Sequence, residues 1–330
     1  MKKRHKYVAP PIPAVPADER RPFWSVMIPT YNCAEYLAKT LGSVLVQDPG
    51  PGLMQIEVVD DCSTKDDPES VVRDIGQGRV AFFRNPQNRG AIRNFNTCLR
   101  RSKGCWVHIL HGDDVVQWDF YETMGHYARR FPEAAILAAR SFVINEEDKV
   151  LSLSPRIPEM ESLTMDARHL FLENKLRTPG VVVRRDFYEK HGGFLEELVH
   201  TADWEMWCRG FALGGGLVLD RALARYREFA RNDTSRLARS GENLRDCLRA
   251  RDVFSREYPC FERRRFTNLI RVNAACQLER FRQLGDDEAV RNNRRLCKDL
   301  GGIGWSARAS VKRFMESVPF LRSIAALCLW

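Results

Sequence analysis

The sequence lacks the cysteine pairs and the long apolar segments that define several large classes of protein. Its ten cysteines are scattered and none stands in a Cys-x-x-Cys pair, so the spacing indicates neither a zinc module nor a disulfide framework. Reduced thiols of this kind are typical of a cytosolic protein. No stretch reaches the roughly 18 to 20 uninterrupted apolar residues that a membrane-spanning helix needs. These absences predict a cytoplasmic protein that is soluble or peripheral to a membrane.

The first 21 residues contain little apolar material on which to fold. Residues 1–6 are basic, but a proline-rich string follows them in place of the apolar core of a signal peptide. We therefore expect a flexible, polyproline-like leader over residues 1–21. A globular domain is expected over residues 22–235. The Arg-rich, helically spaced sequence over residues 236–330 predicts a helical C-terminal extension.

Positive charge exceeds negative charge along the chain. The 52 lysines and arginines outnumber 43 acidic residues, which gives a formal net charge of +9 over 330 residues. Such an excess favours anionic partners such as phosphates, nucleic acids or anionic lipids, without choosing among them. The composition, 44% hydrophobic and 29% charged, allows one large core or two moderate ones.

Short apolar runs alternate with helically spaced segments from residue 23 onward. This alternation predicts an α/β fold with a mostly parallel sheet and right-handed crossovers. The expected strands cover residues 23–29, 55–59, 80–83, 105–110, 134–144, 177–185 and 216–219. The expected helices cover residues 35–45, 68–75, 91–101, 120–131 and 186–191, with a further helix opened by Thr201 and Asp203.

Polar side chains stand where three of the expected strands end. Tyr31 follows the first strand, Asp60 and Asp61 follow the second, and Asp113 and Asp114 follow the fourth. Ligands of open α/β sheets bind beyond the carboxyl ends of strands, so these groups are expected to converge on one edge. Adjacent carboxylates repel each other, and a divalent cation between them and a diphosphate would offset that cost. The plain alternative is an Asp-Asp turn that only ends a strand.

Two histidines near this acidic pair, His108 and His111, could suggest a metal-binding pair. Their odd offset along a strand sends them to opposite faces, however. The pattern favours core packing for His108 and leaves an edge-of-site role open for His111.

The end of the chain, residues 305–330, mixes cationic with large apolar side chains. Such a segment can dock on an anionic membrane. It can equally pack on the rest of the protein or on a second subunit. Both interpretations stay open at this stage, with packing favoured.

The motifs, taken in order, resemble those of the family-2 inverting glycosyltransferases of GT-A fold, over roughly residues 23–234. Each piece is weak alone, and their order and spacing together carry the resemblance. The matching pieces are Val26 to Asn32, Val58 to Thr64, Asn88 to Gly90 with Arg93 and Asn94, Leu110 to Asp114, Gly192 to Phe194, and Ala202 to Trp207. The resemblance implies a GT-A type, Rossmann-like, mostly parallel sheet flanked by helices, with a helical C-terminal extension.

The resemblance also implies an enzyme that moves a sugar from a nucleoside diphosphate by a single inverting displacement. Its metal, Mn²⁺ or Mg²⁺, would neutralise charge on the departing diphosphate. A carboxylate would take the proton of the attacking hydroxyl. The implied base is Asp203, the implied metal ligands are Asp114 and Asp113, and the implied nucleotide-sugar contacts are Pro29, Thr30, Tyr31, Asp60, Asp61, Arg93 and Asp113.

Three positions depart from the family pattern. His111 stands at the first position of the metal motif, where many relatives have an acid, and Ala202 stands where Glu often precedes the base. Phe229 replaces a histidine that frequently helps to hold the diphosphate or the metal. Residues that could supply diphosphate contacts in its place are Arg227, Arg231 and Asn232.

The implied donor is a UDP-, GDP- or dTDP-sugar, and the implied acceptor is a hydroxyl of a glycan, a lipid-linked glycan or a protein, as in polysaccharide biosynthesis. No specific nucleic acid is expected. The expected location is the cytoplasm, with peripheral contact at the inner face of the cell membrane left open.

Two other functions remain open. A nucleotidyltransferase would normally carry a Gly-rich, basic phosphate loop after the first strand, where this chain has Pro29 to Asn32. A noncatalytic nucleotide-sugar or nucleic-acid binding module would need arginines that converge with exposed aromatic side chains in a groove.

Overall fold

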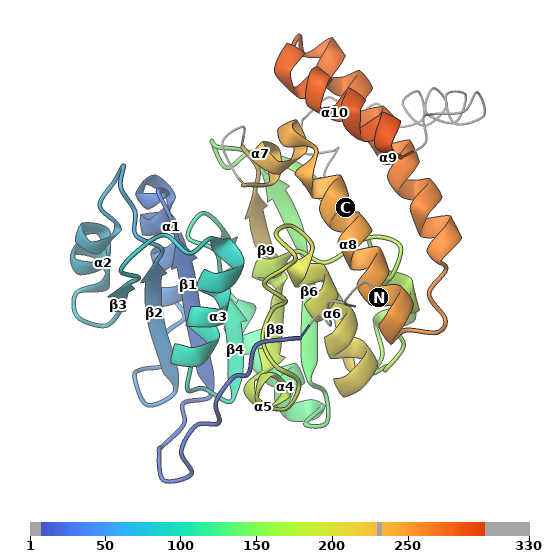
Figure 1. Ribbon diagram of the computed structural model, residues 1–330. Helices are drawn as coiled ribbons and strands as arrows, with labels where there is room; N and C mark the ends of the chain where they lie inside the picture. The colour runs from blue at the N-terminus through green and yellow to red at the C-terminus, as the bar shows by residue number, and fades with distance from the viewer. Residues whose placement is uncertain (1–7, 230–232, 301–330) are drawn as a thin grey trace. The chain divides into compact units, whose positions relative to one another are not determined.

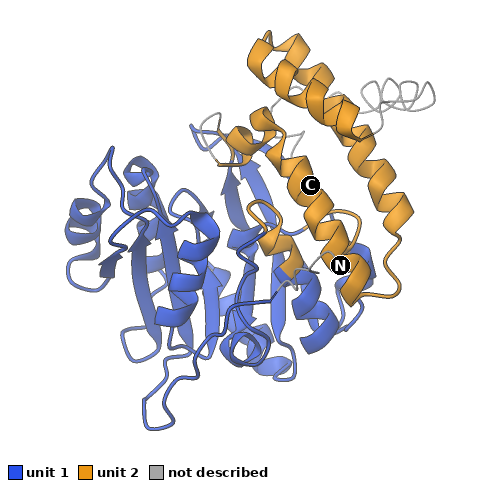
Figure 2. Ribbon diagram, viewed as in Figure 1, with its two compact units in different colours: residues 1–169, 176–197, 206–227 blue, residues 170–175, 198–205, 228–330 orange. Residues whose placement is uncertain are grey.

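The computed structural model describes residues 8–229 and 233–300. Figure 2 colours its two compact units: unit 1 comprises residues 1–169, 176–197 and 206–227, and unit 2 comprises residues 170–175, 198–205 and 228–330. Unit 2 thus holds the C-terminal helices together with two short segments from the body of the chain. Within the described ranges, no helix combines the length and the apolar character that crossing a bilayer requires. The tail over residues 305–330 lies outside the described residues.

Unit 1 is built on a nine-stranded sheet in the order β3-β2-β1-β4-β8-β6-β9-β5, with β7 paired to β6. Figure 1 shows β3, β2, β1 and β4 side by side; these four strands are parallel. The strand β8 then runs antiparallel to both β4 and β6, whereas β9 is parallel to β6. The strands are β1 (Trp24–Thr30), β2 (Met54–Asp60), β3 (Ala81–Arg84), β4 (Trp106–Ile109), β5 (Val115–Val116), β6 (Ile136–Ile144), β7 (Val150–Leu153), β8 (Val181–Arg184) and β9 (Gly216–Arg227).

Helices alternate with these strands, which confirms the α/β class expected from the sequence. Those of unit 1 are α1 (Ala34–Leu45), α2 (Pro68–Gly76), α3 (Ala91–Arg101), α4 (Phe120–Arg130) and α5 (Arg185–His191). The helix α6 (Ala202–Gly214) has its first turn in unit 2 and the remainder in unit 1. Unit 2 adds α7 (Asp233–Ser240), α8 (Glu242–Glu257), α9 (Arg263–Gln283) and α10 (Asp287–Asp299).

The packing of β1 in the core of unit 1 explains why its sequence forms a continuous apolar run. All of its residues are buried, as expected for a parallel strand covered on both faces. Val26 and Ile28 belong to one cluster with Leu37 and Leu41 of α1. The helical spacing of those two leucines therefore fixes which face of α1 packs on the sheet.

Two short strands were not expected from the sequence. The strand β5 has only two residues, and β7 has four half-exposed or exposed residues on one side of β6. Strands so short and so little buried leave no clear period of alternation in the sequence. The strand β9 is in turn longer than expected, because it runs from Gly216 through two register shifts against β6 to Arg227.

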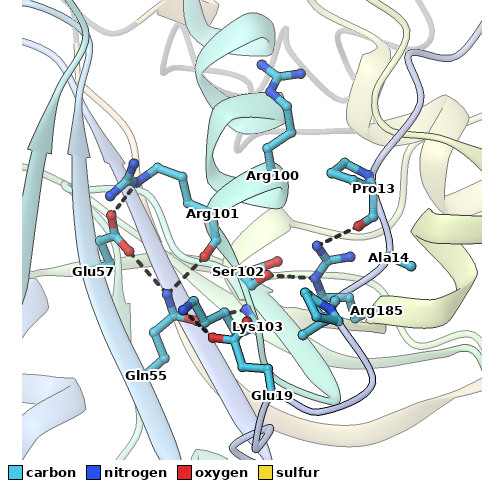
Figure 3. Close-up of a pocket in the computed structure, with 12 residues that line it drawn as sticks. Pro13, Ala14, Glu19, Gln55, Glu57, Arg100, Arg101, Ser102, Lys103 and Arg185 are labelled. Atoms are coloured by element: carbon cyan, nitrogen blue, oxygen red, sulfur yellow. Dashed lines mark hydrogen bonds and ion pairs between the residues drawn. The ribbon is translucent and has the colours of Figure 1, made fainter.

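Residues 8–21 pack on other parts of unit 1, which differs from the flexible leader expected from the sequence. Ile12 is only 3% exposed. The buried guanidinium of Arg185 donates to the carbonyl oxygens of Pro13 at 3.1 Å and of Ser102 at 2.7 Å. Figure 3 shows Arg185 between these two carbonyls, beside a cavity of about 390 Å³. One buried apolar side chain and satisfied carbonyl groups thus order a segment that is poor in apolar residues.

His108 packs in the core of β4, as its strand position predicted. It is fully buried, its Nδ1 lies 3.0 Å from the hydroxyl of Tyr121, and its Nε2 lies 3.0 Å from the carbonyl oxygen of Pro179. Its ring stacks on Phe120. Burial lowers the pKa of His108 to about 3, because the charged imidazolium loses its hydration.

This buried histidine should make stability depend on pH. The unfolded chain binds a proton at His108 below a pKa of about 6.5, and the folded chain binds one only near pH 3, so stability falls as pH falls through that window. Between pH 7 and pH 5, the wild type should lose about 2 kcal/mol more unfolding free energy than His108→Gln. Urea denaturation at both values measures the difference. His126→Gln, at an exposed position, is the control, and parallel losses in wild type and His108→Gln would refute this assignment.

Candidate nucleotide and metal site

The carboxyl ends of β1, β2 and β4 meet at one edge of the sheet. Thr30 and Asp60 are paired residues of neighbouring strands, and the amide of Asp61 donates to the carbonyl oxygen of Thr30 at 2.9 Å. The amide of Gly112 donates to the carbonyl oxygen of Pro29 at 3.0 Å. The three motifs predicted to share an edge are therefore neighbours in unit 1.

Asp60 and Asp61 hold the loops around this edge. Asp60 is fully buried and accepts a 2.7 Å hydrogen bond from Nε of Arg84. Asp61 is 2% exposed and accepts hydrogen bonds of 2.8 to 3.0 Å from the amides of Arg89 and Gly90, just before α3. Its carboxylate thus satisfies backbone donors at the start of a helix.

The loop after β1 is tied to the loop after β2. Asn32 adopts a φ of +50°, and its side-chain oxygen accepts from the amides of Thr64 at 2.9 Å and Lys65 at 3.0 Å. Asparagine tolerates this left-handed conformation better than most residues. The neighbouring Tyr31 is left 46% exposed, so its ring is available to a ligand. Thr30 is buried, with its hydroxyl 2.9 Å from Sγ of Cys33.

Arg93, which the resemblance implies as a nucleotide-sugar contact, is also at the surface of unit 1. Its side chain is 55% exposed, and its Nε donates to Glu196 at 2.9 Å. An exposed ion pair of this kind contributes about 0 to 1 kcal/mol. The pair can therefore open for a ligand at little cost.

A possible cation site lies in the loop after β4. His111, Asp113 and Asp114 each offer a ligand atom, and these atoms lie within 4.8 Å of one another. Nδ1 of His111 is 3.4 Å from Oδ2 of Asp114. The sequence singled out the two carboxylates as ligands, and the structure brings His111 to them as well.

Two buried contacts fix the backbone of this loop. The hydroxyl of Thr40, in α1, lies 3.0 Å from the carbonyl oxygen of Gly112 and 2.8 Å from that of Asp114. A Cβ added at Gly112 would lie 3.0 Å from the hydroxyl oxygen of Thr30, so the position is tight for any side chain. Sequence reasoning missed Thr40, although a threonine between the apolar positions Leu37 and Leu41 is a visible signal.

Arg227, at the end of β9, contacts the loop that carries Asp113 and Asp114. Its backbone amide donates to Oδ1 of Asp114 and its Nε to the carbonyl oxygen of Asp113, both at 2.8 Å. The same guanidinium donates to the carbonyl oxygen of Asn145 at 2.9 Å and to Oδ1 of Asp148 at 2.6 Å. With 1% exposure, Arg227 holds protein groups. The sequence suggested it as a diphosphate contact; Arg231 and Asn232, suggested for the same role, lie outside the described residues.

Asp203, predicted as the general base, belongs to unit 2. It is the second residue of α6, and its Oδ1 accepts a 2.6 Å hydrogen bond from the amide of Trp204. Nδ2 of Asn174 lies 3.5 Å from its Oδ2. The side chain of Trp204 is fully buried and donates from Nε1 to the carbonyl oxygen of Leu170 at 2.6 Å. Asp203 thus lies inside the first turn of α6.

The comparison with protein families gives a match over half of the chain. The model of the family described as Glycosyl transferase family 2 matches residues 25–192. An uncharacterized protein of Mycobacterium tuberculosis, MT1568, is 27% identical over 70% of this chain and 75% of its own length. An uncharacterized glycosyltransferase of Mycoplasma genitalium, MG060, is 29% identical over 34% of this chain and 39% of its own length.

Solved glycosyltransferase structures share the fold. TarS of S. aureus, residues 1–349 in complex with UDP, has a TM-score of 0.51 and 18% identity over 82% of this chain and 89% of that one. The mannosyltransferase PcManGT of Pyrobaculum calidifontis, in complex with GDP-Man and Mn²⁺, has a TM-score of 0.57 and 17% identity over 99% of this chain and 89% of that one. These likenesses confirm the GT-A type fold expected from the sequence.

Replacing Arg227 should reveal how strongly the loop depends on it. Lysine cannot reproduce the fork of donors, so Arg227→Lys leaves buried carbonyl oxygens unsatisfied and should lower the free energy of unfolding by about 2 kcal/mol or more. Urea denaturation measures the change. The matched control is Lys39→Met, which removes the other, half-exposed partner of Asp148 and should cost less than about 1 kcal/mol. Equal small losses in both variants would contradict a fixing role for Arg227.

Proposed function

Since the chain belongs to glycosyl transferase family 2, we propose that it transfers a sugar from a nucleoside diphosphate donor to an acceptor hydroxyl, with inversion at the anomeric carbon. The observation that carries the proposal is the grouping of His111, Asp113 and Asp114 at the same sheet edge as the exposed ring of Tyr31. That edge offers a cation site and an aromatic surface together, which is what a nucleoside diphosphate requires.

The donor set of the loop fits a divalent cation. Two carboxylates suit Mg²⁺ or Mn²⁺, and the added imidazole of His111 favours Mn²⁺, because Mg²⁺ prefers oxygen ligands throughout. We propose that Asp114 and Asp113 hold the cation, with His111 as a further ligand. A cation bound there would neutralise charge on the leaving diphosphate.

The residues of this chain would divide the remaining tasks. Tyr31 would stack against the nucleotide base, with Pro29 and Thr30 shaping the floor beneath it. Asp60 and Asp61 would contribute mainly by fixing the loops that face the base or the ribose, since both carboxylates already accept several protein donors. Arg93 would exchange its exposed partner Glu196 for the ligand.

Asp203 would act as the general base, by accepting the proton of the attacking acceptor hydroxyl. Two features support this assignment. The carboxylate lies in the first turn of α6. The next residue, Trp204, is fully buried and donates a hydrogen bond to the carbonyl oxygen of Leu170 within unit 2. The position of Asp203 also matches the acidic residue before tryptophan in the family motif. A fixed carboxylate with an apolar neighbour is suited to proton transfer in a substrate complex.

The proposed donor rests on less specific observations, and the proposed acceptor rests on the family resemblance. Structures with the same fold have been solved with UDP, with UDP-GlcNAc and with GDP-Man. We propose a UDP-, GDP- or dTDP-sugar as donor, and a glycan, lipid-linked glycan or protein hydroxyl as acceptor. We also propose a cytoplasmic location, because the scattered spacing of the cysteines is typical of reduced thiols.

The Asp203→Asn variant tests the proposed reaction. Full-length protein with Mn²⁺ is incubated with UDP-GlcNAc or GDP-mannose, and the release of UDP or GDP is measured. The amide cannot take a proton, so release should fall by roughly 10²- to 10⁴-fold, while binding of the nucleotide stays within about twofold of wild type.

The control for this variant is Asp252→Asn, at a half-exposed carboxylate of α8 that pairs with arginines. This variant should keep wild-type turnover. Undiminished release in Asp203→Asn would remove Asp203 as the base. Nucleotide binding without release from any donor, in wild type as well, would favour a noncatalytic binding module.

A further inference from the structure

A buried carboxylate of the C-terminal helices holds the segment that leads into the Asp203 helix. Asp246, in α8, is fully buried. Its Oδ2 accepts hydrogen bonds from the amide of His200, the amide of Thr201 and the hydroxyl of Thr201, all at 2.8 Å. Its Oδ1 accepts from the amide of Val199 at 3.2 Å. All of these groups belong to unit 2.

The carboxylate of Asp246 also pairs with an arginine of its own helix. Nε of Arg249, one turn later in α8, donates to Oδ1 at 2.8 Å. Arg249 also pairs with Glu242. Hydrogen bonds to a charged acceptor are about twice as strong as neutral ones, so a carboxylate with this many donors holds the segment firmly.

These contacts add a distant acceptor at the point where the chain enters α6. A threonine before the first helical residue is a common cap of a helix. Here the hydroxyl of Thr201 donates to Asp246. The entry to α6 is thus set by a side chain 45 residues later in the sequence, and Asp203 lies only two residues beyond Thr201.

Aromatic packing in the same unit supports the same region. The ring of Trp204 contacts Phe254 of α8 at a centroid distance of 5.4 Å and Phe266 of α9 at 5.6 Å. The residues on both sides of Asp203 are therefore held by the C-terminal helices, through hydrogen bonds before it and ring contacts after it.

We propose that Asp246 is a positioning residue for the transfer reaction: through the backbone of residues 199–201 it fixes the carboxylate of Asp203 toward the acceptor hydroxyl. This inference rests on the proposed function, since it takes Asp203 as the base. It assigns the helical extension a part in catalysis beyond stabilising the fold. A displacement of about 1 Å at a reacting group can cost about a hundredfold in rate.

The test compares Asp246→Asn with Asn243→Ala in the full-length protein. Asn243 is also buried in α8, and its amide donates to Gln277 at 2.9 Å without touching residues 199–201. Both variants should destabilise unit 2. Only Asp246→Asn should lower kcat for release of UDP from UDP-GlcNAc, or of GDP from GDP-mannose, by about 10- to 100-fold with KM within twofold of wild type.

Thr201→Val gives a second, milder variant that keeps the backbone contacts. It removes only the hydroxyl donor and should lower kcat by about three- to tenfold. Amide hydrogen exchange provides a readout that needs no donor: exchange at Thr201 to Trp204 should speed up in Asp246→Asn and stay unchanged in Asn243→Ala. Unchanged exchange there would overturn the proposal.

A double variant separates this proposal from the proposed function. If Asp246 acts through Asp203, then Asp203→Asn combined with Asp246→Asn should be no slower than Asp203→Asn alone. Losses that multiply, or a wild-type kcat in Asp246→Asn, would overturn the positioning role while Asp203 remains the base. Wild-type turnover in Asp203→Asn would instead remove Asp203 as the base, and the positioning role of Asp246 with it.

Discussion

The buried guanidinium of Arg227 is the constraint on which the candidate metal loop depends. It connects the end of β9 with the carbonyl oxygen of Asp113 and with the turn between β6 and β7, and it lies 4.7 Å from the ring centroid of Tyr36 in α1. The backbone amide of Arg227 adds a hydrogen bond to Oδ1 of Asp114. A buried charge is tolerated only when its donors are paired. The strand, the turn and the helix must therefore all be in place around it, so the loop is already formed before any ligand arrives.

Much of the fold could be predicted because β1 and the helices near it obey simple rules. A buried parallel strand gives a continuous apolar run, and the leucines of α1 recur at helical spacing on one face. Elements whose stability comes from distant partners could not be predicted. The segment over residues 8–21 is held by Arg185, which lies far along the chain. No local sequence pattern indicates such a contact.

The residues of the candidate site also fall into two groups, those that could be predicted from the sequence and those that could not. The acidic pair at Asp113 and Asp114 could be predicted because it follows an expected strand, as the polar groups after two other strands do, and the structure adds His111 to it. The partners that fix these residues were not visible. Arg227 was read as a ligand contact because its charge is evident in the sequence and its burial is not. The role of Asp246 could not be predicted from the sequence, because one acid among the many charged residues of α8 resembles a solvent-exposed residue.

Metal-dependent nucleotide binding at this edge is the central claim, and a thermal-shift panel tests it directly. UDP, GDP, dTDP and CDP are each added with Mn²⁺, Mg²⁺ or EDTA to wild type and to Asp114→Asn, which keeps an acceptor for the amide of Arg227. We predict that one nucleotide raises the melting temperature of the wild type with Mn²⁺, by the equivalent of about 2.7 kcal/mol at 100 times its Kd. The rise should vanish in EDTA and in the variant. An equal rise without metal, or no response to any nucleotide, would contradict the account.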